Sequence, residues 1–263
     1  MANIMKKSDI YDYFWDKILE DQEIMDVEGE AFYNKIVFNT FVKLIDNLLS
    51  KYPYDLELSK QIKNLKKEND IEAIYSLIKR EYLYRYVRVN VKSVDFPKDL
   101  KRTMLIPLRT TILEMMVAIL STLDTMGCHL LSMYKDKISF LTPIDEGGSM
   151  NEEYSAVDNY TISIFSLKTM KLWYDYGEDW LFDVSFSKLE YLDEYISLKV
   201  LKFRGRGIVE DNKEVLSDFL NHQENEFIEE YALNEYFDDT VEDINDRAIS
   251  EYDSLVMAYM GLL

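Results

Sequence analysis

The sequence predicts an α+β protein in which a mostly antiparallel or mixed β-sheet carries a packed helix and is flanked by N-terminal and C-terminal helices. Three observations predict this class. Residues 1–80 repeat apolar side chains at helical spacing, residues 82–203 contain short segments that alternate apolar and polar residues, and the residues after 207 return to helical spacing. The middle region begins in the order strand, strand, helix, strand, strand, which requires a sheet that is not purely parallel.

Helices are expected throughout the first 80 residues. Ser8 begins a pattern of apolar pairs four residues apart, so one face of the first helix should be buried. A second helix is expected from Glu28 to Lys51, because Pro53 ends the pattern. Shorter helices are expected over residues 56–67 and, after a cap at Asn69 or Asp70, over residues 71–80.

Strands dominate the middle of the chain. The segment "YLYRYVRVNVKSV", which begins at Tyr82, alternates β-branched or aromatic residues with polar ones, and "RTMLIP" continues the sheet after the "DFPKD" turn. Thr110 or Thr111 is expected to cap a helix that runs to about Met126. Two strands, "HLLSMYK" and "KISFLTP", should then meet at a tight turn. Residues 145–159 are expected to form a surface loop, and further strands are expected at 171–176, 180–187 and 195–203.

After Gly207 the apolar residues again follow helical spacing among many acids, with breaks expected at 221–226 and 237–240. The chain is therefore divided into a helical N-terminal extension (1–80), an α+β core (81–220) and an acidic helical C-terminal segment (221–263).

Charge restricts the classes of partner. The net charge is −19, and residues 203–263 carry 16 Asp or Glu against 4 Lys or Arg. A chain this acidic is not expected to bind nucleic acid generally or to bind an anionic membrane surface. Between Lys79 and Arg109, however, nine Lys or Arg stand against three Asp or Glu. This stretch is interpreted either as a solvated strand face or as a docking patch for an acidic partner, which could be the protein's own C-terminal segment.

The single cysteine, Cys128, excludes an intramolecular disulfide. The first residues lack the apolar run of a signal peptide, and the most apolar window, residues 111–123, is interrupted by Glu114 and is shorter than a membrane span. A cytoplasmic protein without a membrane segment or cofactor is therefore expected.

The acidic turn "YDYGEDW", residues 174–180, is the most distinctive motif. One interpretation makes it a corner between two strands, with Gly177 at positive φ, with Asp175 or Asp179 accepting backbone N–H groups, and with Trp173 and Trp180 packed inward. The other makes it a magnesium or manganese site. Its ligands would be Asp175, Glu178 and Asp179, completed by Glu210, Asp211 or His129.

Two neighbouring motifs are interpreted structurally. Cys128 and His129 are adjacent in an expected strand and should point to opposite faces, so a cysteine nucleophile with a histidine base is not expected, and His129 should be buried and hydrogen-bonded. Gly205 and Gly207 precede acids rather than the Lys or Ser/Thr of a phosphate loop. They are expected to end a strand in a tight turn, with Asp211 or Asn212 capping the next helix.

Three segments, "YRYVRVNVKSVDFPKDLKRTMLIPLRTTILEMMVAILSTLDTMGCHLL", "WYDYGEDWLFDVSF" and "VLKFRGRGIVEDN", together resemble the plasmid pRiA4b ORF-3-like family over residues 82–220. The most specific elements are the turn from Tyr174 to Trp180 and the Gly127–His129 segment; an acidic loop of the family survives here as residues 209–212. The chain has Leu100, Lys101 and Arg102 where the family has a tryptophan and two arginines, and Leu131 replaces a second histidine.

The family has no assigned biochemical activity, so the resemblance implies a fold rather than a reaction. Some members are labelled as resolvases. That chemistry needs a nucleophilic serine among arginines and a basic DNA-reading helix, and neither is visible in this sequence.

Three functions follow as hypotheses. The first is a non-enzymatic protein-binding or adaptor module, with an unidentified protein partner. The second is a divalent-metal-dependent hydrolase or nuclease, and the third is a mobile-element or phage regulator whose acidic residues 203–263 mimic nucleic acid. The sequence does not predict the oligomeric state. The candidate binding residues are Tyr174, Tyr176, Trp180 and Arg102, and the candidate catalytic residues are Asp175, Asp179, Glu210 and His129.

Overall fold

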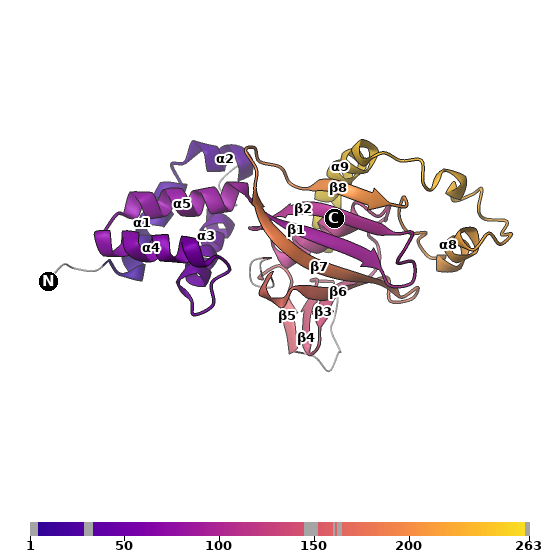
Figure 1. Cartoon of the computed structure of the whole chain (residues 1–263), viewed down its shortest axis with the longest axis horizontal. Helices are drawn as coiled ribbons and strands as arrows, with labels where there is room; N and C mark the ends of the chain where they lie inside the picture. The colour runs from indigo at the N-terminus through magenta and orange to yellow at the C-terminus, as the bar shows by residue number, and fades with distance from the viewer. Residues whose placement is uncertain (1–4, 29–33, 145–151, 160, 162–164, 261–263) are drawn as a thin grey trace. The chain divides into compact units, whose positions relative to one another are not determined.

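The structure is a computed structural model that describes residues 5–28, 34–144, 152–159, 161 and 165–260. Within these residues the chain has the predicted α+β class, with helices before and after a mixed eight-stranded sheet (Figure 1). It divides into two compact units. The first comprises residues 1–85, 107–109 and 191–195, and the second comprises residues 86–106, 110–190 and 196–263.

The first unit is helical, as its apolar spacing predicts. Asp55 and Asp70 cap the last two of its helices by accepting backbone N–H groups, and Phe14, Phe41 and Tyr75 pack against one another in its core. The helix expected over 28–51 is α3, which begins only at Asn34. The helices are α1 (Lys7–Ile18), α2 (Gln22–Glu28), α3 (Asn34–Leu49), α4 (Leu56–Glu68) and α5 (Ile71–Tyr84).

Helix α5 continues four residues past Arg80, where it was expected to end. Ile74, Ile78 and Tyr82 are spaced four residues apart and are all buried. Tyr82, which the sequence predicts to start a strand, therefore belongs to the buried stripe of the helix. The first strand begins only at Arg85.

Glu81 is a buried carboxylate in the first unit. It is 1% exposed, accepts hydrogen bonds from the hydroxyls of Tyr54 (2.6 Å) and Tyr191, and lies 3.9 Å from Arg85 Nε. Burial raises the pKa of Glu81 above its ordinary value of 4.5 despite these partners. The folded protein therefore holds this proton to a higher pH than the unfolded chain does.

Replacing Glu81 with Gln is expected to remove a pH-dependent loss of stability. Below pH 4.5 the group is protonated in both states, whereas above it the unfolded chain ionises first and the native state loses stability until the raised pKa is passed. The free energy of unfolding of Glu81→Gln minus that of wild type should thus increase as the pH rises from 4.5 to 7.5 in urea titrations followed by circular dichroism. Glu68→Gln, at an exposed position on α4, is the control. Parallel pH curves for Glu81→Gln and wild type would contradict the buried position.

The sheet lies in the strand order β5-β4-β3-β6-β7-β1-β2-β8. Strand β4 pairs with β5 in parallel, while the pairs β3–β4, β3–β6, β6–β7 and β2–β8 are antiparallel. The strands are β1 (Arg85–Ser93), β2 (Lys101–Pro107), β3 (Leu131–Lys135), β4 (Ile138–Leu141), β5 (Glu152–Ser155), β6 (Thr169–Tyr174), β7 (Trp180–Tyr191) and β8 (Lys199–Arg204).

Strand β5 corrects the expected loop over residues 145–159. All four of its residues are exposed, so "EEYS" has no apolar alternation from which the strand could have been predicted. Residues 145–151 lie outside the described part of the chain.

Helix α6 (Ile112–Leu120) is the packed helix of the prediction. Thr111 caps it in a capping box with Glu114, and all residues of the helix except Glu114 are buried. It ends at Leu120, earlier than the expected Met126, because the hydroxyls of Ser121 and Thr122 bond back to carbonyl groups of the last turn. None of the described helices is long and apolar enough to cross a membrane.

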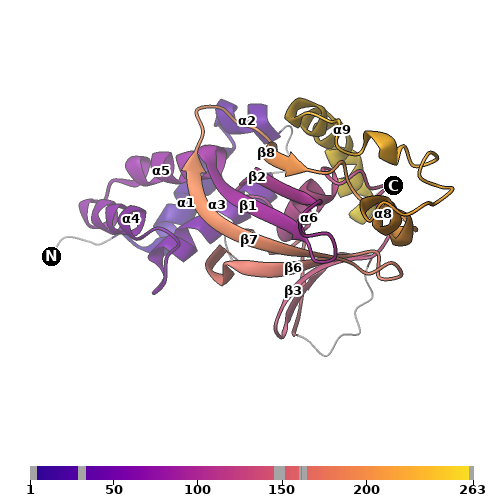
Figure 2. The same ribbon diagram turned by 45° about the vertical axis from the view of Figure 1, so that its right-hand side comes forward.

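The C-terminal segment belongs to the second unit. Ala248, Leu255 and Tyr259 of α9 (Val241–Tyr259) share one core cluster with α6. Between the two expected breaks, residues 227–236 form turns and a short 3-10 helix (Leu233–Glu235) instead of the expected helix. Helix α8 (Lys213–Leu220) precedes them. Figure 2 shows α6 behind the sheet, and both figures show α9 alongside β8. Among the helices that the structure describes in this unit, none covers the opposite face of β1 and β7.

Candidate functional site

Three segments that are distant in the sequence meet at one end of the sheet. His129 precedes β3, the acidic turn joins β6 to β7, and Glu210 and Asp211 follow β8. The ring nitrogens of His129 lie 3.6 Å from Asp175 Oδ1 and 3.1 Å from Asp211 Oδ1. The residues that meet there, called the His129 cluster below, are Cys128, His129, Tyr174, Asp175, Glu210 and Asp211.

The acidic turn is built as a corner, although not by the residue expected. Asp175 (φ 51°) and Asp179 (φ 57°) adopt the left-handed conformation, while Gly177 does not have a positive φ. Aspartate tolerates this region because its side chain can bond to nearby backbone groups. Asp175 Oδ1 accepts the backbone N–H groups of Gly177 (3.1 Å) and Glu178 (3.3 Å), as the corner interpretation predicts.

The same turn holds the start of α8. Glu178 accepts the backbone N–H of Lys213 (2.9 Å), while Asn212 makes no side-chain cap, so the expected cap at Asp211 or Asn212 is replaced by an acid from the turn. Lys213 Nζ donates to the carbonyl oxygen of Asp179 (2.8 Å) and pairs with Asp95 (2.6 Å). At least one acid of the turn, Glu178, therefore has a structural role, because it holds the start of α8.

Two of the predicted binding residues are buried. Trp180 and Tyr174 are both 0% exposed, and Trp180 packs against Phe96, so neither offers a surface to a partner. Trp173, expected to point inward, is instead half-buried and stacks on the half-buried Tyr176 with ring centroids 4.3 Å apart. Among the predicted aromatic anchors, only Tyr176 reaches the surface.

Cys128 and His129 do not lie on opposite faces of a strand. Both precede β3, in an irregular segment that follows Gly127 (φ 66°), and strand alternation does not apply there. Donor atoms of Cys128, His129 and Glu210 all lie within 4.8 Å of one another. His129 is not fully buried either, since its side chain is 25% exposed. Its Nε2 atom is shielded from solvent and makes no hydrogen bond to any residue that the structure describes, because the contact with Asp211 lies outside hydrogen-bonding geometry.

The carboxylate of Glu210 is held in position by uncharged hydrogen-bond donors. It accepts the backbone N–H of Met126 (2.8 Å) and the hydroxyl of Tyr174. Burial raises the pKa of Tyr174, so this hydroxyl remains a donor at neutral pH. Burial, together with Glu210, also raises the pKa of the Cys128 thiol, whose sulfur lies 3.8 Å from Glu210 Oε2.

Asp179 does not join Asp175 and Glu210. Within the described residues, the two groups of potential metal ligands are Cys128, His129 and Glu210, and His129, Asp175 and Asp211. The predicted catalytic set is therefore only partly assembled, because the exposed Asp179 belongs to neither group. The motif placed Asp179 in the predicted set, but a hydrogen bond from Asp179 N to the carbonyl oxygen of Asp175 (2.7 Å) shows that its backbone closes the turn.

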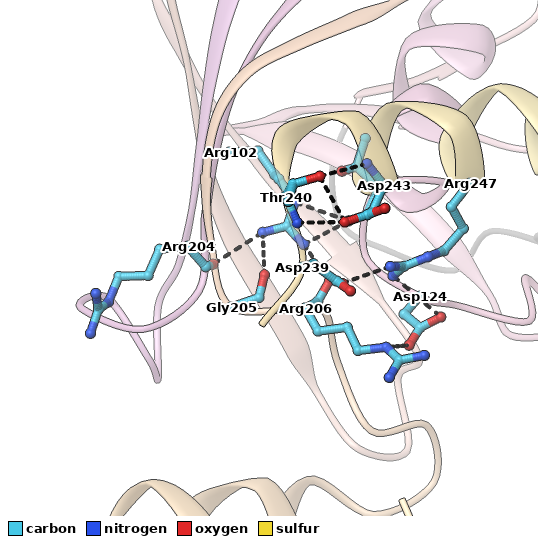
Figure 3. Close-up of polar contacts among 10 residues, drawn as sticks. Arg102, Asp124, Arg204, Gly205, Arg206, Asp239, Thr240, Asp243 and Arg247 are labelled. Carbon is cyan, nitrogen blue, oxygen red and sulfur yellow. Dashed lines mark hydrogen bonds and ion pairs between the residues drawn. The ribbon is translucent and has the colours of Figure 1, made fainter. Parts of the chain in front are cut away.

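Arg102 is a structural residue rather than a binding residue. It is 1% exposed, and its guanidinium donates to the carbonyl oxygens of Lys101, Thr122, Arg204, Gly205 and Arg206 at 2.5–3.1 Å. Figure 3 shows this group beside a second polar network, in which Asp124 contacts Arg206 (2.9 Å) and Arg247 (3.6 Å). The network fixes the segment that leads to Glu210.

A pocket of about 350 Å³ adjoins the cluster. Glu210 and Asp211 form part of its wall, and Asp124, Arg206 and Tyr236 form another part. Asp124 and Arg206 lie in the resembling segments, but neither was among the predicted site residues, because no local pattern marks them as polar wall residues of a pocket. The pocket gives small solutes a route to the carboxylates of the cluster.

The uncovered face of the sheet carries a row of basic residues. Lys101 stands opposite Arg204 across β2 and β8, and Lys171 stands opposite Asp183 across β6 and β7. The bond from Ser93 N to Leu100 O and that between the Asn90 and Thr103 side chains set the β1–β2 register, which places Lys92 beside Lys101. Val94 N bonds to Leu181 O, which places Asp183 on the other side of Lys92. The basic row, in strand order, consists of Lys171, Asp183, Lys92, Lys101 and Arg204.

No protein-family model matches the chain, and no curated protein matches it significantly. Among solved structures, a crystal structure of a protein of unknown function from Methanosarcina mazei Go1 matches with a TM-score of 0.49 and 18% identity, over 61% of this chain and 93% of that one.

Proposed function

We propose that the protein is a non-enzymatic protein-binding module, and that the basic row holds an acidic segment of its partner. One observation carries this proposal: four cations and a single acid stand in register across five neighbouring strands on a sheet face that no described helix of the unit covers. The wider charge of the chain is strongly negative, so this row is a local exception. Complementary charge of this kind favours encounter with an acidic surface.

Lys92 and Lys101 are central to the row. Both are exposed, and neither forms an ion pair with any residue that the structure describes. The outer members are partly neutralised, because Lys171 pairs with Asp183 (2.6 Å) and Arg204 lies 3.7 Å from Asp99. The unpaired charge is therefore concentrated on β1 and β2, inside the basic stretch that the sequence singled out.

An acidic protein segment fits this face better than nucleic acid does. Tight binding to a nucleic acid requires several phosphates to be neutralised at once, and here the row is interrupted by Asp183 in a chain of charge −19. Membership of the pRiA4b ORF-3-like family is part of this proposal. It is supported by the convergence of the resembling segments, since His129, the acidic turn and Glu210 all meet in the His129 cluster.

Reversing the two central lysines is expected to abolish partner capture. The full-length chain, the variant Lys92→Glu/Lys101→Glu and the control Lys63→Glu/Lys67→Glu would each be immobilised and exposed to nuclease-treated host extract. The control changes charge equally at exposed positions of α4. At least one acidic protein should be captured by wild type and control, and its yield should fall at least tenfold with the β1–β2 variant, as expected for like-charge contacts.

Equal capture by both double variants would overturn the proposal. Capture of a basic protein in equal yield by wild type and by the Lys92→Glu/Lys101→Glu variant would also overturn it, and would favour nucleic-acid mimicry by residues 203–263. Capture that disappears on nuclease treatment would show that the face binds nucleic acid instead.

A further inference from the structure

We propose that the His129 cluster binds one divalent transition-metal ion of the zinc class. Its ligands are the Cys128 thiolate, His129 Nε2 and the carboxylates of Glu210 and Asp211, while Asp175 orients the His129 ring from the Nδ1 side. This proposal does not depend on the basic row, which lies on another part of the unit. It rests on donor geometry, on unsatisfied buried atoms and on charge.

Two pairs of donor atoms lie close to the spacing that a small metal ion requires. Zinc is held at about 2.0–2.3 Å from nitrogen, oxygen and sulfur ligands, so neighbouring donors of a tetrahedral site lie roughly 3.3–3.8 Å apart. Cys128 Sγ lies 3.8 Å from Glu210 Oε2, and His129 Nε2 lies 3.1 Å from Asp211 Oδ1. Donor atoms of Cys128, His129 and Glu210 all lie within 4.8 Å of one another, and Asp211 adjoins this group through His129.

Two buried polar atoms in the cluster have no hydrogen-bond partner. One is His129 Nε2, and the other is Oδ2 of Asp175, a residue that is 3% exposed; neither atom has a partner among the described residues. Buried polar atoms in proteins are almost always satisfied, so such a pair calls for an explanation. A cation on Nε2 satisfies the first atom. It also leaves the proton on Nδ1, where the Asp175 carboxylate, 3.6 Å away, can accept it.

The negative charge of the cluster also favours a bound cation. Asp175, Glu210 and Asp211 bring three carboxylates together, and among the described residues none of them pairs with a lysine or arginine. The hydrogen bonds to Glu210 come from a backbone N–H, a phenol and a thiol, which offset little of its charge. A divalent ion would offset most of this repulsion.

The mixed donor set selects the class of metal. Magnesium and calcium prefer sites made only of oxygen, whereas a thiolate with an imidazole and carboxylates suits zinc or cobalt. This differs from the magnesium or manganese site that the sequence suggested for the acidic turn, because Asp179 is absent from the cluster and Cys128 is present. Cys128 and Asp211 are both exposed, so an ion can enter from solvent.

Cobalt titration of the reduced, chelator-treated full-length chain is the direct test. Co²⁺ in a tetrahedral site with a thiolate ligand gives a sulfur-to-metal charge-transfer band in the near ultraviolet and intense visible bands. We expect both, with one ion per chain, and we expect Zn²⁺ but not Mg²⁺ to displace the cobalt.

Conservative variants assign the ligands. Cys128→Ser should lose the charge-transfer band, and Asp211→Asn should bind Co²⁺ at least tenfold more weakly. Both positions are exposed, and asparagine accepts the left-handed backbone at residue 211 (φ 56°), so both variants should fold, with unchanged circular dichroism. His222→Asn, at the other histidine of the chain, is the matched control and should bind as wild type does. Absence of cobalt binding, or wild-type spectra and affinity in Cys128→Ser and Asp211→Asn, would overturn the proposal.

Discussion

Replacing Arg102 with Met is expected to lower the free energy of unfolding of the second unit by about 3–5 kcal/mol, the range seen when a buried charged network loses one side. Methionine fills much of the volume but donates no hydrogen bond. The carbonyl oxygens of Thr122, Gly205 and Arg206 would then be left buried without their donor, along with two others. Each unsatisfied buried acceptor costs on the order of 1–3 kcal/mol, and relaxation of the backbone recovers part of the sum.

The expected loss is large because Arg102 joins two parts of the chain. Its donors connect the turn after α6, at Thr122, with the end of β8, at Arg204 to Arg206. Burial lowers the pKa of Arg102 to about 10, so the group remains charged at neutral pH and its hydrogen bonds are charge-assisted.

Tryptophan fluorescence can report on the second unit alone. Of the three tryptophans, Trp15 lies in the first unit and Trp173 and Trp180 in the second, so urea unfolding would be followed in a Trp15→Phe background. The control is Arg204→Met on the next strand. Arg204 is 57% exposed and 3.7 Å from Asp99, and an exposed pair of this kind contributes at most about 1 kcal/mol. If Arg102→Met unfolded at the same urea concentration as Arg204→Met, the hydrogen bonds from Arg102 to the five carbonyl oxygens would not be the stabilising element.

Arg102 also shows which features the sequence could predict and which it could not. The cap at Thr111 with Glu114, the alternation of β1 and the turn between β6 and β7 are local patterns, and each produces the expected local structure. The basic stretch from Lys79 to Arg109 is a different case. It contains both the buried Arg102 and the exposed Lys92 and Lys101, and no local pattern separates them because three of the five acceptor carbonyls of Arg102, those of residues 204–206, lie about a hundred residues later in the chain.

The candidate site also contains some features that local sequence predicts and others that it does not. The acidic turn was recognisable as a corner because alternating strands flank it, and Asp175 bonds to the backbone as expected. The positive φ values fall on Asp175 and Asp179 instead of Gly177, since aspartate side chains can stabilise that conformation themselves. The approach of Cys128 to Glu210 depends on where β3 begins, and element boundaries are set by packing more than by local sequence.

Replacing Gly207 with Ala is the second substitution with a large expected effect. Gly207 lies where the chain after β8 crosses the turn after α6, and Ile208 N bonds to Leu123 O (2.9 Å). A Cβ at position 207 would overlap the backbone carbonyl of Leu123 and would lie 2.7 Å from Asp124 Cβ. Because the obstacle is mainly backbone, no side-chain rotation can relieve it, and we expect a loss of about 3 kcal/mol in the free energy of unfolding.

Gly177→Ala is the matched control for this substitution. Gly177 does not need a positive φ, and a Cβ there would meet only Asp175 Oδ1 at 3.3 Å, so we expect a change within about 0.5 kcal/mol. Both variants would be unfolded in urea in the Trp15→Phe background. Gly207 stands three residues before Glu210, so the strain should also displace that carboxylate and weaken cobalt binding, whereas Gly177→Ala should bind cobalt with nearly unchanged affinity. If Gly207→Ala were as stable as Gly177→Ala, the close crossing of these two segments would be wrong, and the position of Glu210 against Cys128 and His129 would lose its structural basis.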